Sequence, residues 1–208
     1  PSAIKWMVYM NTRLIAAGYH ATEWRWTDPG DVTAWTASNF TNVENDGGAI
    51  MNLISLRERL LFFKERNIEV WDHVGSSAVF ARSYTVERGC VASYSVVKAN
   101  NSVYWLGRDG VFYGLAGVEP QVMSKSVQRE INALAVKSDC YGLEFPQENA
   151  IRWFFPTHGR CFRFDYFLGA FYEDNSWETG QWTRLPVNSA MFLDGKTYVG
   201  DYDPTGKV

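Results

Sequence analysis

The chain has 208 residues, a formal net charge of −3 at pH 7, and Phe, Trp or Tyr at 16% of its positions. A chain of this length can bury a substantial core in one domain, and abundant large rings suit the half-buried surfaces of β-sheets. The acidic balance argues against a nucleic-acid-binding surface, because binding to phosphates depends on clustered Lys and Arg.

Cysteine content and hydropathy narrow the class further. Cys90, Cys140 and Cys161 are too few, and odd in number, for a disulfide framework, so we expect free buried thiols in a reducing compartment. No run of about 18 apolar residues exists, and no membrane span is expected. The chain starts at Pro1 without Met and stops within an apparent motif at residues 203–208, so we expect it to be a fragment of a longer protein.

A hairpin-like unit, with apolar or aromatic runs on both sides of a polar turn, recurs about every 45 residues. This period is typical of β-propellers, in which each small sheet must stack on its neighbours to bury its faces. The turns fall near His20, Glu65-Arg66-Asn67, Arg108-Asp109-Gly110, Thr157-His158-Gly159 and Asp194-Gly195.

The first two units are predicted hairpins. Residues 13–18 and 23–26 flank the first corner, and the alternation of Trp24 and Trp26 places both rings on one face of the sheet. Residues 60–64 and 68–71 form the same pattern around the second turn.

The third hairpin, residues 103–113, has the clearest turn, because Asp-Gly favours the positive φ angles of tight hairpins. In the fourth, residues 151–155 and 160–166, we expect Phe162, Phe164 and Tyr166 on a dry face and Arg163 and Asp165 on a wet one. The fifth joins residues 190–193 to 197–200 through a two-residue Asp194-Gly195 turn.

Only residues 124–137 read as helix, with Val127, Ile131 and Leu134 at helical spacing. We expect a short connector between blades, and the alternative is a partner-binding helix. No Gly/Ser-rich or charged linker divides the chain. The predicted fold is therefore all-β, a single β-propeller-like domain over residues 1–208 with four or five antiparallel blades and one connector helix.

Catalytic, cofactor and metal sites are not expected. His20, His73 and His158 are scattered, and no nucleophile elbow, phosphate-binding glycine loop or zinc-binding helix motif appears. Asp201-Tyr202-Asp203 with Gly206 resembles part of a calcium loop but lacks the later acidic ligand, and a turn explains it. The cysteines lack Cys-x-x-Cys spacing, which disfavours zinc.

Aromatic and basic residues raise the question of sugar or DNA binding. Asp28-Pro29-Gly30 followed by Trp35 resembles a sialidase turn, but Trp26 occupies the Ser/Thr position and the closing Trp is two residues late. Rings exposed at equivalent blade positions would indicate carbohydrate binding.

Basic residues are densest between positions 57 and 66, but acidic residues interleave with them, so a solvated, mixed-charge hairpin is favoured over a DNA clamp. The set comprises Arg57, Arg59, Lys64 and Arg66, with Glu58, Glu65 and Glu69 interleaved.

The order of these motifs resembles the packaged-DNA stabilisation proteins, the tail hub or nozzle, of P22-like short-tailed phages. The likeness extends over roughly residues 10–180, and the motifs that carry it are residues 26–35, 47–50, 60–64, 68–71, 88–97 and 103–110.

This resemblance implies a virion structural protein without catalytic residues. The family's subunits assemble as a ring, expected to be a hexamer, below the portal and its adaptor, and bind the tail needle and tailspikes. The ring continues the DNA channel, retains the packaged genome and passes double-stranded DNA at ejection without sequence-specific binding. The implied location is the virion tail, after assembly in the bacterial host cytoplasm. The sequence does not indicate which residues face DNA, and the main rival reading is a carbohydrate-binding, receptor-binding propeller module.

Overall fold

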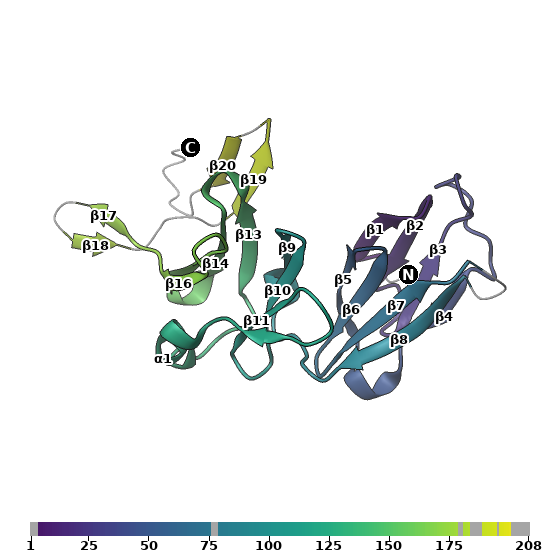
Figure 1. Ribbon diagram of the computed structural model, residues 1–208, viewed down its shortest axis with the longest axis horizontal. Coiled ribbons are helices and arrows are strands. Elements are labelled where there is room, and N and C mark those ends of the chain that lie inside the picture. The colour runs from purple at the N-terminus through teal and green to yellow at the C-terminus, as the bar shows by residue number, and fades with distance from the viewer. Residues whose placement is uncertain (1–3, 76–78, 179–180, 184–188, 195, 201–208) are drawn as a thin grey trace. The chain divides into compact units, whose positions relative to one another are not determined.

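The computed structural model describes residues 4–75, 79–178, 181–183, 189–194 and 196–200. The chain divides into two compact units, residues 1–90 with 117–120 and residues 91–116 with 121–208. Strands dominate both units, and each four-stranded sheet is an antiparallel meander of consecutive strands (Figure 1). The all-β prediction is confirmed.

The first unit contains two such sheets. The first sheet comprises β1 (Trp6–Met10), β2 (Arg13–Ala17), β3 (Glu23–Trp26) and β4 (Phe40–Asn42), paired in that order. A 3-10 turn, η1 (Asn45–Gly47), leads into β5 (Ile50–Leu56), β6 (Arg59–Lys64), β7 (Ile68–His73) and β8 (Phe80–Val86).

The second unit contains two more four-stranded sheets and two hairpins. After η2 (Ser93–Ser95), the third sheet pairs β9 (Val97–Ala99), β10 (Ser102–Leu106), β11 (Phe112–Leu115) and β12 (Gln121–Val122). The fourth pairs β13 (Tyr141–Phe145), β14 (Ala150–Phe155), β15 (Arg160–Asp165) and β16 (Ala170–Glu173), with η4 (Pro146–Glu148) and η5 (Pro156–His158) at its turns. The hairpins are β17 (Ser176–Glu178) with β18 (Gln181–Thr183), and β19 (Ser189–Leu193) with β20 (Lys196–Gly200).

All five predicted hairpins are present. They correspond to β2–β3, β6–β7, β10–β11, β14–β15 and β19–β20. In the last turn Asp194 has a positive φ of 49°, as a tight turn requires. Gly195 and the calcium-loop-like residues 201–206 lie outside the described residues.

Aromatic side chains fill the space between the two sheets of the first unit. Trp24 and Trp26 share the inward face of β3, as predicted, with ring centroids 5.0 Å apart. The Trp24 ring also lies 4.8 Å from Phe62 and 5.2 Å from Phe80 of the second sheet. The first strands of the two sheets, β1 and β5, lie side by side, as neighbouring blades do around a propeller axis.

The second unit repeats this arrangement. Trp153 of β14 is fully buried, stacks on Phe171 at 5.6 Å and contacts Phe112 of the third sheet at 4.5 Å. Its indole N–H donates to the Ser95 carbonyl at 2.8 Å, so the polar edge of the ring is also satisfied.

The predicted connector helix is shorter than expected. A 3-10 turn, η3 (Lys125–Val127), leads into α1 (Gln128–Asn132), which has five residues. Val127, Ile131 and Leu134 are buried as the pattern predicted, but the helix stops before residue 137. The Val136 N–H donates to His158 Nε2 at 3.0 Å instead of to a helical carbonyl, so a tertiary contact replaces the next turn. No helix among the described residues combines the length and apolar character that a bilayer crossing requires.

The prediction of a wet face on β15 is wrong for Asp165 and holds only in part for Arg163. Arg163 keeps only 18% of its side chain exposed and donates to Glu148 Oε2 at 2.7 Å. The Asp165 carboxylate is buried, and hydrogen bonds from the Phe167 and Leu168 N–H groups offset its loss of water. The face that bears Arg163 and Asp165 is therefore less exposed than predicted, and Tyr166 lies beyond the end of the strand, half-buried against the core.

Candidate functional site

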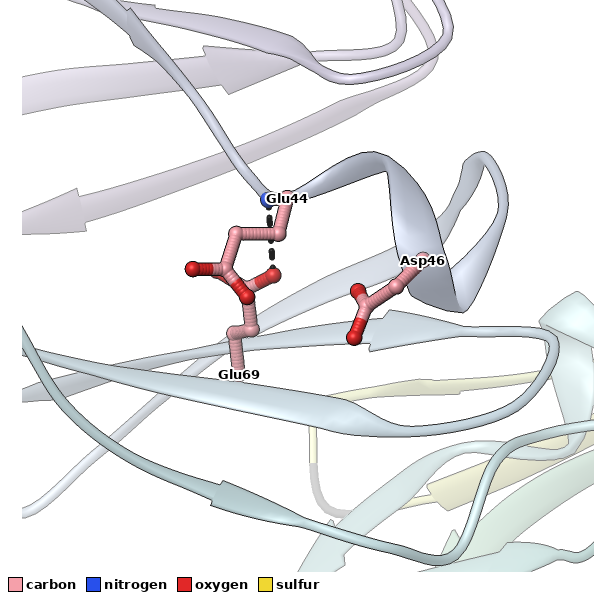
Figure 2. Close-up of side chains that lie close together, drawn as sticks. All are labelled: Glu44, Asp46 and Glu69. Atoms are coloured by element: carbon pink, nitrogen blue, oxygen red, sulfur yellow. Dashed lines mark hydrogen bonds between the residues drawn. The ribbon is translucent and has the colours of Figure 1, made fainter.

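The most chemically concentrated cluster in the described residues lies in the first unit, at the end of the second sheet. Glu44, Asp46 and Glu69 place carboxylate oxygens within 4.8 Å of one another (Figure 2). Glu69 comes from β7 and is 1% exposed, Asp46 lies in η1, and Glu44 immediately precedes that turn. Three acidic groups at this separation are the kind of set that could hold a metal ion.

The positive charge in this cluster is supplied by the protein itself. Lys64 is fully buried, and its ammonium donates to Glu69 Oε1 at 2.5 Å, to the Glu44 carbonyl at 2.9 Å and to Asp46 Oδ1 at 3.4 Å. An ammonium has three donors, and three acceptors surround it. The cluster is therefore a buried lysine with its counter-charges, and the ammonium occupies the position that a cation would take.

The carboxylates of Glu69 and Glu44 make further polar contacts. Glu69 Oε1 also accepts the Glu44 N–H at 2.8 Å, and its Oε2 accepts the Trp71 indole N–H at 3.0 Å. The Glu44 carboxylate pairs with Arg82 of β8. Both carboxylates join the loop before β5 to the strands of the second sheet.

Electrostatics at the cluster favour the charged forms. Partial desolvation acts to raise the pKa of Asp46, but hydrogen bonding and charge from Lys64 outweigh it, so the pKa of that carboxyl lies below its ordinary value. The Glu44 carboxylate raises the pKa of Arg82. The lowered pKa of Asp46 and the raised pKa of Arg82 are typical of structural ion pairs. A general base working near neutral pH instead needs a raised carboxyl pKa.

A second ionic network lies in the second unit and involves Glu148, which closes η4. The Arg152 guanidinium donates to both Glu148 oxygens at 3.0 and 2.8 Å, and its Nε donates to Asp174 at 2.6 Å. Arg163 donates to the same Glu148 carboxylate. The Arg152 hydrogen bond is the largest cause of the lowered pKa of Glu148. Here too the arginines of β14 and β15 are paired with carboxylates, which lie in η4 and just after β16.

Each of the three histidines packs against or hydrogen-bonds to a neighbouring residue. His20 is exposed beside Tyr19, with ring centroids 4.5 Å apart, and His73 packs on Phe80 at 5.4 Å. His158 accepts a backbone hydrogen bond from Val136. Each histidine therefore has a structural contact of its own.

The three cysteines are buried and form no disulfide, as predicted. Desolvation raises the pKa of Cys161 far above that of an exposed thiol. A thiol in this environment remains protonated, and a protonated thiol is a poor nucleophile.

The sialidase-like segment forms a loop closed by its own side chains. The Asp28 carboxylate accepts hydrogen bonds from Thr36 and Asn39 at 2.7 Å each, and these bonds lower its pKa. Asp28 thus fixes the loop between β3 and β4, and Trp35 lies on that loop with 40% of its surface exposed.

The prediction of a solvated, mixed-charge hairpin is confirmed only in part. Arg57 and Glu58 are exposed in the β5–β6 turn, with positive φ values of 49° and 62°. Lys64 and Glu69, by contrast, are buried, so the prediction that they are solvated is wrong. The reason is that Lys64 is the last residue of β6 and points into the enclosed space beside η1, where Gly47 leaves room for its side chain.

The sequence analysis did not predict the buried network of Lys64 and Glu69, although one feature of the sequence points to it. Lys64 follows four apolar residues that are all buried, and the five-residue separation from Glu69 spans a tight turn. A hairpin brings such positions together. The alternation of charges alone does not indicate that the Lys64–Glu69 ion pair is the buried one.

Two meanders of four antiparallel strands in each unit, packed through aromatic faces, define the blades of a β-propeller protein. The family model described as "Bacteriophage P22 Gp10, beta-propeller" matches residues 2–165, and the chain belongs to this family of phage-particle structural proteins.

One similar solved structure supports the fold. The computationally designed Ika8 protein matches with a TM-score of 0.57 at 14% identity, covering 96% of this chain and 56% of that one. The chain thus spans about half the length of that structure. The designed Ika4 protein (TM-score 0.44, 13% identity, 74% and 85% covered) and Kluyveromyces lactis Hsv2 (TM-score 0.42, 8% identity, 81% and 60% covered) are more distant. No curated protein matches the sequence.

Proposed function

We propose that the chain is a non-enzymatic component of the phage tail hub or nozzle. As part of a homo-oligomeric ring, expected to be a hexamer, it continues the DNA channel below the portal and adaptor and helps to retain the packaged genome until ejection. In this role the chain is a fragment of a longer protein and contributes to one propeller-like domain. The family match over residues 2–165 is the observation that carries the proposal.

The charge distribution is compatible with a DNA conduit. A channel from which double-stranded DNA leaves quickly should lack arrays of unpaired cations, because each phosphate contact strengthens binding. In the described residues Lys64, Arg82, Arg152, Arg160 and Arg163 are all paired with carboxylates. Retention of the genome by such a protein is then steric, through closure of the ring, and involves no sequence-specific DNA contact.

The ionic networks suit a load-bearing role. The Lys64 and Glu148 clusters connect loops and strands within a unit, and the aromatic cores join neighbouring sheets. A protein that withstands the pressure of packaged DNA benefits from such cross-connections, whereas a catalyst needs groups left free to react.

Carbohydrate binding is the alternative function that the sequence analysis left open. It calls for Trp or Tyr residues exposed at equivalent positions of successive blades. The exposed Trp and Tyr rings of the described residues instead occupy different kinds of element: Tyr9 lies on β1, Trp35 in the β3–β4 loop, Tyr94 in η2, Tyr172 on β16 and Tyr198 on β20. This distribution favours the structural role.

An add-back experiment tests the proposal. DNA-filled phage heads that carry portal and adaptor but lack this gene product should leak DNA, and adding the complete protein should restore DNase protection and place a ring on the portal in electron micrographs. Heads without the adaptor serve as the control and should not recruit the protein. Unchanged leakage together with an empty portal end would contradict the proposal.

A further inference from the structure

Lys64 lies beside a second reactive group besides its counter-charges, the side-chain amide of Asn67. Lys64 ends β6, and its backbone N–H donates to the Asn67 carbonyl at 2.9 Å, so the two residues oppose each other at the end of the β6–β7 hairpin. Opposed residues of an antiparallel pair present their side chains on the same face. Lys64 is fully buried and Asn67 is 3% exposed, so the fold keeps bulk water from both side chains.

Gly47 allows the ends of these two side chains to come together. A Cβ at this position would lie within 2.6 Å of both Lys64 Nζ and Asn67 Oδ1, so the two atoms are close neighbours. Any side chain at position 47 would have to push them aside, because contacts this short are not tolerated. The amine and the amide therefore share one enclosed space beside the backbone of Gly47.

The hydrogen bonds of Asn67 leave its side-chain carbonyl unused. Within the described part of the chain, the buried Oδ1 atom has no hydrogen-bond partner, whereas the amide nitrogen hydrogen-bonds to Asp46. An unsatisfied buried carbonyl is costly, and a role in chemistry is one explanation for it. The Lys64 ammonium directs its donors to three other acceptors, so it lies near the amide without being held at the amide oxygen.

Two carboxylates are placed for the proton transfers that attack by an amine requires. An ammonium becomes a nucleophile only after it loses a proton, and Glu69 Oε1 accepts a hydrogen bond from Lys64 Nζ at 2.5 Å. At this distance the proton passes directly, without a bridging water. Asp46 points toward Glu69 (Figure 2) and holds the nitrogen of the Asn67 amide, which is the group that would leave.

We propose that Lys64 and Asn67 join spontaneously in a side-chain amide bond across the β6–β7 turn, with Glu69 as the proton acceptor. Lys64 Nζ gives one proton to Glu69, attacks Asn67 Cγ and forms the new C–N bond. The bond from Cγ to Nδ2 then breaks, and Nδ2 takes the proton held by Glu69 and a second proton from Nζ. One secondary amide and one ammonium ion result, so atoms and charge balance and no cofactor or oxidant is consumed.

The enclosed site supplies what a free lysine and a free asparagine lack in water. Amines and amides do not react at a useful rate in solution, but groups held side by side gain a high effective concentration, and a near-attack separation is about 3–3.5 Å. Small rotations of the Lys64 side chain in the space beside Gly47 provide that approach. Asn67 is a better partner than Asp46, because a neutral amide carbon is more open to a nucleophile than the carbon of a carboxylate.

Intact mass spectrometry of the denatured 208-residue chain tests the proposal. After folding and incubation, the mass should be lower than the sequence mass by one ammonia, about 17 Da. Trypsin should cut after Arg59, Arg66 and Arg82 but not after Lys64, because the amine of Lys64 is acylated. Residues 60–66 and 67–82 should therefore remain joined as one branched peptide. A folded wild-type chain with the full sequence mass would overturn the proposal.

Substitutions assign the bond to its two residues. Lys64→Arg and Asn67→Ala should each show the full sequence mass. The matched control is Lys125→Arg, which changes an exposed lysine of η3 and should keep the deficit of one ammonia. Loss of the deficit in this control, or its persistence in Asn67→Ala, would overturn the proposal. The wild-type mass decides the proposal by itself, even if a variant fails to fold.

The proton acceptor has its own test. Glu69→Gln preserves the size of the side chain but removes the group that takes the proton, and should slow the appearance of the mass deficit at least ~100-fold. Circular dichroism establishes that this variant is folded. A folded Glu69→Gln chain that loses ammonia at the wild-type rate would overturn the role of Glu69.

Other reactions of the same residues leave different products. Cyclisation of Asn67 onto its own backbone also releases ammonia, but that deficit would persist in Lys64→Arg, and trypsin would cut the wild-type chain after Lys64. An amide bond from Lys64 to Asp46 or Glu69 would release water instead of ammonia, a difference that intact mass resolves. Either product would overturn the bond to Asn67. None of these readouts involves DNA retention, so the proposal stands or falls separately from the tail function.

Discussion

At the residue scale, the most consequential side chain is Lys64. A buried ammonium is tolerated only when acceptors surround it, and here Glu69, Asp46 and the Glu44 carbonyl do so. Such a pair adds little net stability relative to an apolar core, but removal of one partner leaves an uncompensated buried charge.

We therefore expect Lys64→Met to destabilise the protein by about 3–5 kcal/mol, because Glu69 would remain buried without its counter-charge. Urea unfolding followed by circular dichroism measures the change. The matched control is Arg59→Met, which breaks the exposed pair with Asp72 and should cost under about 1 kcal/mol. The double variant Lys64→Met/Glu69→Gln should recover part of the loss, and a double variant no more stable than Lys64→Met would contradict this account.

Glycine spacing provides a second prediction at this scale. A Cβ on Gly89 would lie 2.0 Å from the Glu65 carbonyl oxygen, which is backbone and cannot move aside. Gly89→Ala should therefore destabilise the protein by about 2 kcal/mol or more, measured as above. Gly117 has open space around its Cβ position, and Gly117→Ala should be neutral. Equal stability of the two variants would show that the β6–β7 turn shifts freely.

At the element scale, the hairpins were predictable and the ends of the elements were not. Alternating rings such as Trp24 and Trp26, and turn residues such as Asp109-Gly110, carry local information about strands and turns. The burial of Arg163 and Asp165, the early end of α1 at Asn132 and the enclosure of Lys64 all depend on tertiary contacts and side-chain hydrogen bonds. A single sequence contains no record of those contacts.

The turn between β13 and β14 makes a prediction about pH. Arg152 lowers the folded-state pKa of Glu148 below its ordinary value of 4.5, so its stabilisation is fully present above that pH and is lost as pH falls through the lowered folded pKa. Tm should thus fall on acidification, and Glu148→Gln should reduce the part of this fall below pH 4.5. Thermal melts between about pH 3 and pH 7 measure it. An identical pH profile in wild type and Glu148→Gln would exclude this role for Glu148.

At the scale of the whole molecule, stability depends on the packing of sheets against sheets. No four-stranded meander buries both of its faces alone, so the aromatic contacts between sheets hold each unit together. The Lys64 and Glu148 networks add connections within each unit, and the family relationship gives this architecture its biological context.

Trp153 is the clearest test of sheet-to-sheet packing. Trp153→Ala would remove a fully buried ring and its hydrogen bond to Ser95, and should cost about 3–5 kcal/mol in the free energy of unfolding. Phe167→Ala, at a turn position that is 82% exposed, should change stability by less than about 0.5 kcal/mol. Similar costs for the two variants would argue against an aromatic core as the source of cohesion.

The most direct test of the central claim is a cryo-electron microscopy map of the intact phage particle that encodes this chain. The account predicts that these four-stranded blades fit density in the tail, repeated around the DNA channel below the portal, with this sequence detected in purified particles by mass spectrometry. Particles that lack the protein, or blades found only as a sugar-binding module away from the channel, would contradict it.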